Sequence, residues 1–66
     1  MAADIQVRNE GSIVQFVPLT PFGKQVLHNN VSADPWQWLG DTLCVEWRYS
    51  EELALELSDL GVEICV

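Results

Sequence analysis

The chain has 66 residues, of which 48% are hydrophobic, and a formal net charge of −7 at pH 7. This length allows one domain near the lower size limit for unassisted folding, and the apolar content with three tryptophans excludes a disordered chain. The excess of carboxylates disfavours direct nucleic-acid binding because phosphates are repelled, and no apolar run is long enough to span a bilayer.

The first part of the chain predicts a β-hairpin. Residues 3–8 alternate apolar and polar side chains, which is the period of a half-buried strand, and residues 12–17 are rich in β-branched residues. Residues 9–11 between them are typical of a turn in which Gly11 supplies a positive φ. Pro18 cannot donate to a sheet ladder, so we expect the second strand to end there or to lie at an edge.

Residues 21–29 predict a short helix. Thr20 is a good capping residue, and the proline that follows it suits the first helical position. Gly23 lowers the stability of such a helix by about 1 kcal/mol relative to alanine.

A second hairpin is expected further along the chain. A short strand at residues 36–39 and a longer strand at residues 42–48 are joined by Gly40 and Asp41, which favour a two-residue type II′ turn. On the longer strand we expect Trp47 to point the same way as Leu43.

A second helix is predicted to begin at Ser50, with Glu51 and Glu52 in its first turn, where the helix dipole favours anions. Its core-facing stripe is Leu53, Ala54, Leu57 and Leu60. Gly61 ends the helix, and residues 62–66 alternate as a closing strand.

The predicted elements follow the order β-β-α-β(β)-α-β. This order indicates an α+β fold in which a small single-layer antiparallel or mixed sheet carries two helices packed on one face. We expect residues 1–66 to form a single domain.

The acidic side chains are distributed unevenly along the chain. Residues 1–33 carry two acidic and two basic side chains, whereas residues 34–66 carry eight acidic side chains against Arg48 alone. On the second helix, Glu52, Glu56 and Asp59 are spaced at i, i+4 and i+7, which places them on one side of the helix. One interpretation is a solvated helix face that keeps the protein soluble.

The sharper interpretation is a docking surface for a partner protein with a basic surface. Leu55 lies next to the acidic residues and off the core stripe, as an apolar anchor does at an interface. The three tryptophans either fill the small core or contact a partner, since Trp dominates interface hot spots. The candidate partner-binding residues are Glu46, Glu52, Leu55, Glu56, Asp59, Glu63 and Trp36.

No motif in the sequence points to catalysis or to a cofactor. His28 is the only histidine and has no nucleophile beside it, and neither a phosphate-binding loop nor metal-ligand spacing occurs. We therefore expect a protein that is not an enzyme, with no catalytic residues, metal or cofactor. Because no signal peptide is visible, we expect cytosolic Cys44 and Cys65 to be reduced and partly buried, with a disulfide as the minor alternative.

Several short motifs carry a resemblance to a known group of proteins. They are FVPLTP at residues 16–21, GDTLCVEWRY at residues 40–49, Leu53, and DLG at residues 59–61. The chain resembles uncharacterised small proteins of proteobacterial phages, prophages and plasmids with the pattern F-x-P-x-[TS]-P…G-x-x-L-x-V-E-x-R-Y-x-x-x-L…D-G. It departs from the pattern at Leu60, which separates the final Asp and Gly, and at Trp47, where His is frequent. The resemblance implies origin from a mobile element and brings no catalytic residues.

Two functional hypotheses follow from these observations. The leading one is a non-enzymatic phage or mobile-element protein that occupies a basic surface on a protein in the host cytosol. Inhibition of a defence nuclease complex, as an anti-CRISPR or anti-restriction protein whose carboxylates replace DNA phosphates, is its concrete version. The alternative is a structural or assembly module that works as a homo-oligomer, for which an open sheet edge would provide the contact.

Overall fold

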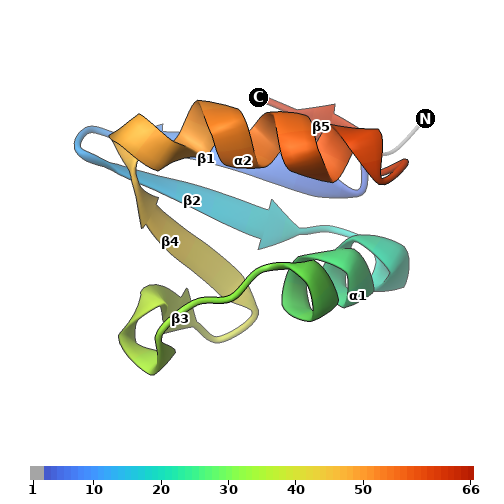
Figure 1. The fold of residues 1–66 in the computed structure, drawn as a ribbon, viewed down its shortest axis with the longest axis horizontal. Helices are drawn as coiled ribbons and strands as arrows, with labels where there is room; N and C mark the ends of the chain where they lie inside the picture. The colour runs from blue at the N-terminus through green and yellow to red at the C-terminus, as the bar shows by residue number, and fades with distance from the viewer. Residues whose placement is uncertain (1–2) are drawn as a thin grey trace.

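The computed structural model describes residues 3–66, and its elements follow the predicted order. Its strands and helices are β1 (Ile5–Glu10), β2 (Ile13–Pro18), α1 (Pro21–Asn30), the 3₁₀ turn η1 (Pro35–Gln37), β3 (Trp38–Leu39), β4 (Thr42–Glu46), α2 (Trp47–Asp59) and β5 (Ile64–Cys65). Figure 1 shows one sheet with both helices in front of it. The predicted α+β class is confirmed.

The sheet has the strand order β3-β4-β2-β1-β5, which the sequence does not reveal. All neighbouring strands are antiparallel except β1 and β5, which run parallel, so the sheet is mixed. β2 lies at the centre, although it ends at Pro18. This proline is tolerated because the β4 ladder begins only at Phe16, leaving Pro18 paired with β1 alone.

The core lies between the sheet and the two helices. Alternation along the strands places one side chain in two on the covered face. The buried side chains are Ile5, Val14, Phe16, Val26, Leu27, Leu43, Val45, Leu57 and Val62. Each large aliphatic or aromatic side chain among them contributes about 1.5–3 kcal/mol through burial. Trp38 packs against this core, whereas Trp36 and Trp47 are exposed.

Both predicted hairpins are present, but the first turn lies at Gly11 and Ser12, because Asn9 and Glu10 of the predicted turn belong to β1. The β1–β2 ladder runs on to Glu10 and Ile13, so the loop is two residues long and Gly11 adopts a φ of 88°. Gly40 and Asp41 connect β3 to β4 with a φ of 64° at the glycine, as the type II′ prediction requires.

The start of α1 is fixed by a cluster around Asp4. Thr20 caps the helix as predicted: its Oγ1 accepts a hydrogen bond from the Gly23 N–H at 3.0 Å and donates to Asp4 Oδ1 at 2.7 Å. Asp4 Oδ2 accepts from the Glu63 N–H at 3.0 Å. The N–H of Glu63 and the hydroxyl of Thr20 thereby lower the pKa of Asp4 below its ordinary value of 3.8.

The prediction for the start of α2 is wrong. β4 ends at Glu46 and the helix begins at Trp47, three residues before Ser50. Ile13, the first residue of β2, pairs with Glu46, so the ladder between β2 and β4 ends at this pair. The Trp47 N–H still donates to the Ser12 carbonyl, at 2.9 Å. Because no further strand partner exists, the backbone satisfies its hydrogen bonds by coiling.

This shift changes the roles of several residues. Trp47 leaves the strand and is 57% exposed instead of pointing with Leu43. Ser50 is inside the helix, where its hydroxyl donates to the Trp47 carbonyl at 2.8 Å. Glu51 and Glu52 consequently lie in the second turn, not in the first.

The two cysteines are free and half-buried. Cys44 on β4 and Cys65 on β5 are separated by β2 and β1. Three strand spacings of about 4.8 Å place them roughly 14 Å apart across the sheet. A disulfide needs Cα atoms within about 7 Å, so this sheet order prevents a bond between them.

Replacing Gly23 by alanine tests the contact between α1 and β1. A Cβ at this position would lie 2.2 Å from the Asp4 carbonyl oxygen. We expect Gly23→Ala to lower the free energy of unfolding by about 1–3 kcal/mol, although alanine is the better helix former. Urea denaturation measures the change. The control is Gln25→Ala at an exposed position of α1, which we expect to be neutral; a stabilising Gly23→Ala would contradict this packing.

The Asp4 cluster predicts a specific pH dependence. Because the pKa of Asp4 is lower in the folded chain than in the unfolded chain, its charged form stabilises the fold at neutral pH. This contribution is lost as the pH falls from about 4 through the lowered pKa. We expect the difference in unfolding free energy between the protein and Asp4→Asn to be larger at pH 7 than at pH 3. An equal difference at both pH values would contradict this prediction. The control is Glu10→Gln, which removes a carboxylate at an exposed position outside the Asp4 cluster.

Candidate functional site

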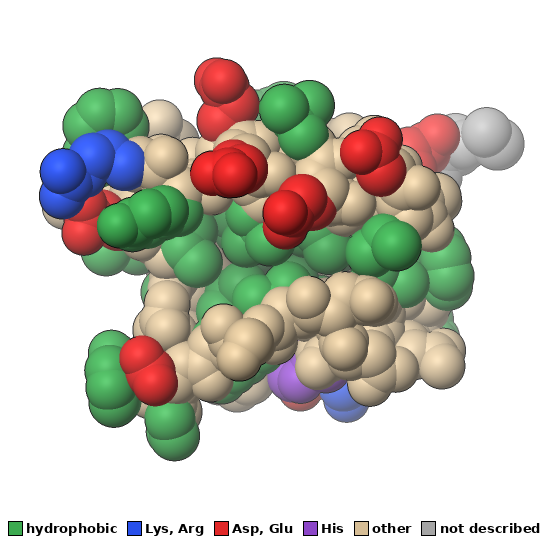
Figure 2. Space-filling model, in the orientation of Figure 1, with side chains coloured by type: hydrophobic (Ala, Val, Ile, Leu, Met, Phe, Trp, Pro, Cys, Tyr) green, Lys and Arg blue, Asp and Glu red, His purple; other side chains and the backbone are tan. Residues whose placement is uncertain are grey.

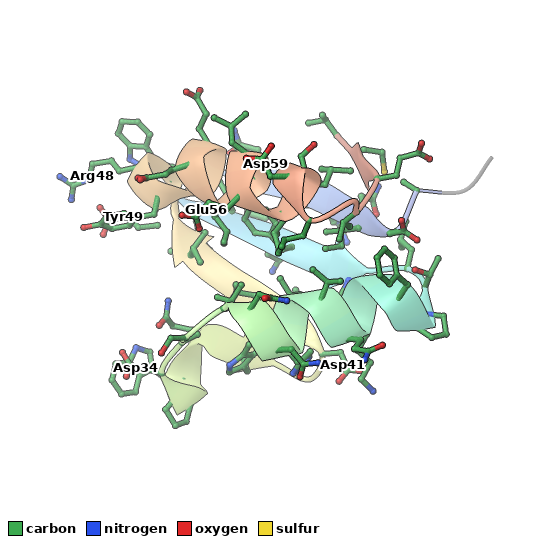
Figure 3. The ribbon with its side chains drawn as sticks, turned by 45° about the vertical axis from the view of Figure 1, so that its right-hand side comes forward. Asp34, Asp41, Arg48, Tyr49, Glu56 and Asp59 are labelled. Carbon is green, nitrogen blue, oxygen red and sulfur yellow. The ribbon has the colours of Figure 1, made fainter. Side chains whose placement is uncertain are left out.

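The predicted acidic stripe exists on α2. Glu52, Glu56 and Asp59 are all exposed, and Figure 2 shows acidic side chains gathered over this helix. Figure 3 shows Glu56 and Asp59 on the visible side of α2, which is the upper helix in this view. At 1.5 Å per residue, the stripe extends about 10 Å along the helix axis.

A groove runs beside this stripe. One wall is α2, and the other is the chain from Asn30 to Gln37, which leads from α1 into η1. The groove consists of a wide hollow of about 690 Å³ and a narrow hollow of about 290 Å³. Val31, Leu53 and Glu56 line both hollows, so the two are continuous. Figure 2 shows apolar side chains at the bottom of the depression below α2.

The lining of the groove is acidic and has no basic side chain. Its carboxylates are Asp34, Glu46, Glu52, Glu56 and Asp59, and neither Lys nor Arg lines either hollow. Asp34 stands on the wall opposite α2, so carboxylates flank the wide hollow from two sides. The groove therefore combines an apolar floor with a negative rim.

Two of the three basic side chains form ion pairs within the described residues, and one of these pairs involves a groove carboxylate. Lys24 Nζ lies 3.3 Å from Asp41 Oδ2, and Arg48 pairs with Glu46. Within residues 3–66, Glu46 is the only carboxylate of the groove in an ion pair. The other four keep their charge available to an external partner.

The structure brings together five of the seven residues predicted from the sequence. Glu46, Glu52, Glu56, Asp59 and Trp36 all line the groove. Leu55 is exposed on α2 but lines neither hollow, and Glu63 lies beside a separate shallow hollow near β5. These last two residues are outside the groove.

Several residues of the groove were not recognised in the sequence. Asp34, Val31 and Tyr49 line it together with Trp36. Val31 and Asp34 belong to a loop without periodicity, so no sequence pattern places them opposite α2. Tyr49 lies between the predicted strand and the predicted helix, and the early start of α2 places it within the helix, where it lines the wide hollow.

His28 has a structural role outside the groove. Its ring stacks on Trp38 with centroids 4.1 Å apart and an interplanar angle of 20°. Its Nε2 lies 3.9 Å from Asp41 Oδ1. These contacts attach α1 to the β3–β4 hairpin.

The described part of the chain offers no cluster of three His, Cys, Asp or Glu side chains placed to hold a metal ion. None of its helices combines the length and the apolar character needed to cross a membrane. Comparison with family models, curated proteins and solved structures gives no match. Function is therefore inferred from the groove and from the charges around it.

Glu56→Lys tests whether the groove carboxylates oppose stability. Glu52 and Glu56 are like charges four residues apart on α2, and the lysine variant converts them into an attractive pair. We expect the variant to be more stable by about 0.5 kcal/mol at low salt, with the gain lost in 1 M salt. Urea denaturation measures it. Glu10→Lys makes the same change of net charge on an exposed strand end, and equal gains from both variants would contradict a local effect.

Proposed function

We propose that this protein is a non-enzymatic binding protein that docks its acidic groove on a basic surface of another protein. The observation that carries the proposal is the lining of the groove, in which carboxylates border an apolar floor and no Lys or Arg occurs. An apolar centre with a polar rim is the usual arrangement of a protein contact site. The rim steers a cationic partner, and the floor supplies burial.

The acidic rim also selects the class of partner. Phosphates of DNA or RNA are repelled by the same carboxylates that attract Lys and Arg. A protein that handles nucleic acid presents a basic surface for its own substrate, and this surface matches the charge of the groove. Direct binding of the chain to nucleic acid is therefore not part of the proposal.

The biological version of the proposal is an anti-defence protein of a phage or mobile element. It acts in the host cytosol and inhibits a CRISPR or restriction nuclease complex by occupying the surface that binds DNA. Support comes from the negative charge of the groove and from the motif resemblance to phage and plasmid proteins. Glu52, Glu56 and Asp59 provide the charge, with Glu46 beside them, and Trp36 is the apolar anchor. Leu55 and Glu63 contribute at most to the outer contact area and to the long-range field.

The alternative function, assembly as a homo-oligomer, is supported by the second face of the sheet. Both helices lie on the other face, as Figure 1 shows. Alternation with the buried positions directs Val17 and Leu39 to the uncovered face, where Leu39 is 67% exposed. Light scattering separates the two functions, because assembly requires a stable oligomer at micromolar concentration and groove docking does not.

Charge reversal in the groove tests the proposed function. In bacteria that carry a CRISPR or restriction system, we expect expression of the protein to restore phage plating. The double variant Glu52→Lys, Glu56→Lys is expected to lose at least tenfold of this protection, since it inverts the charge of one groove wall.

The control is Glu10→Lys, Glu51→Lys, which makes the same change of net charge outside the groove. It is expected to protect like the original protein. Full protection by the groove variant would show that the groove does not act. Absence of protection by the original protein against every system tested would refute the anti-defence version.

A further inference from the structure

The groove has the geometry of a site for a helix. Its carboxylate wall is one face of α2, where successive acids are about 6 Å and 4.5 Å apart along the axis. A second helix lying along α2 repeats the same rise, so basic residues at i, i+4 and i+7 meet Glu52, Glu56 and Asp59 in register. One face of an extended peptide repeats about every 6.6 Å, which matches the step from Glu52 to Glu56 but not the shorter step from Glu56 to Asp59.

The floor of the groove also favours a helix over an extended peptide. It is made by side chains such as Val31 and Leu53, and its long wall is a helix whose backbone groups bond within the helix. Along this helical wall an extended peptide would find no backbone partner, and its N–H and C=O groups facing the apolar floor would stay unpaired. A helix satisfies its backbone internally and presents only side chains.

We propose that the groove binds an amphipathic α-helix of the partner protein, with an apolar stripe flanked by Lys or Arg. This inference rests on the proposed function and names the segment that the groove receives. The apolar stripe lies on Val31 and Leu53, and the basic residues face the stripe of acids on α2. From Tyr49 to Leu60 the groove extends about 16 Å, which corresponds to three turns of the bound helix.

The two hollows differ in the side chains that they accept from the bound helix. The wide hollow is bordered by the exposed aromatic rings of Trp36 and Tyr49 and by Asp34 on the far wall. It accepts the largest apolar side chain of the partner, with cations on both sides of it. The narrow hollow, which ends at Leu60, accepts a smaller apolar side chain with a cation on the α2 side alone.

A second copy of this chain does not match the groove. Its basic residues are Arg8, Lys24 and Arg48, which never occur four or seven residues apart. The helix α2 itself carries the same acidic stripe and would be repelled. Charge complementarity therefore points to a helix of a different protein.

The probe is a 15-residue peptide of Leu and Lys arranged as an amphipathic helix. A second peptide has the same composition in an order without amphipathic period. By calorimetry at 50 mM salt, we expect the amphipathic peptide to bind at least tenfold more tightly. In ¹H–¹⁵N spectra the shifted amides are expected to cluster at Val31, Leu53 and Glu56. Equal affinity for both peptides, or shifts centred elsewhere, would overturn the proposal.

A matched pair of substitutions tests the floor. Leu60→Lys places a charge at the narrow hollow and is expected to weaken binding of the amphipathic peptide at least fivefold. Leu55→Lys makes the same change on an exposed residue of α2 outside the groove and is expected to have no effect. The same spectra report whether both variants are folded. Equal loss from both would overturn the proposal.

The peptide experiments test the helical occupant, and the cell assay tests the proposed function, so their outcomes can be told apart. If the Glu52, Glu56 double variant loses protection while the two peptides bind alike, the proposed function stands and the helical occupant is wrong. If the amphipathic peptide binds in the groove while protection is absent, the anti-defence target is wrong and helix docking stands.

Discussion

Asp4 holds together three segments that are far apart in the sequence. Its carboxylate accepts from the Thr20 hydroxyl and from the Glu63 N–H, and its backbone carbonyl accepts from the Leu19 N–H at 2.8 Å. The start of α1, the start of β1 and the approach to β5 therefore meet at one residue. Gly23 lets the helix come within contact of the Asp4 carbonyl, where any side chain would collide. The direction in which α1 leaves this cluster determines where the chain from residue 30 onward runs, and hence where the second wall of the groove stands.

The groove follows from the way in which so small a chain covers its sheet. α1 and α2 share one face of the sheet (Figure 1), and the groove lies between α2 and the chain that leaves α1 at Asn30. The groove is floored by Val31 and Leu53, which pack against the core and stay partly accessible. Filling it with a partner's apolar side chains removes this surface from water, at about 25 cal/mol per Å². In the proposed complex the acids along α2 select for a cationic partner, and burial of the apolar floor provides most of the affinity.

Local signals in the sequence predict most of the fold, and tertiary pairing accounts for the rest. The cap at Thr20 and the glycine turns depend on neighbouring residues only, so they are visible in the sequence. The start of α2 is not, because residues 42–48 alternate like a strand and only the end of β2 makes Trp47 coil. The same limit applies to the groove. Helical periodicity reveals the acids of α2, but Asp34 lies across the groove on a loop whose course depends on tertiary packing. From the sequence, Gly23 only lowers the helix propensity of α1. In the structure, the absence of a side chain at this position lets α1 approach the Asp4 carbonyl.

Solubility alone does not account for the position of the carboxylates. Glu10, Glu51 and Glu63 are exposed away from the groove, and such positions keep a small protein in solution as well as any other. The groove gathers four further acids without a cation, including the like-charged pair Glu52 and Glu56, at a small cost in helix stability. A lysine at position 56 would remove this cost and leave a net charge of about −5, still sufficient for solubility. The arrangement therefore supports the proposal of a cationic partner that neutralises the acids on binding.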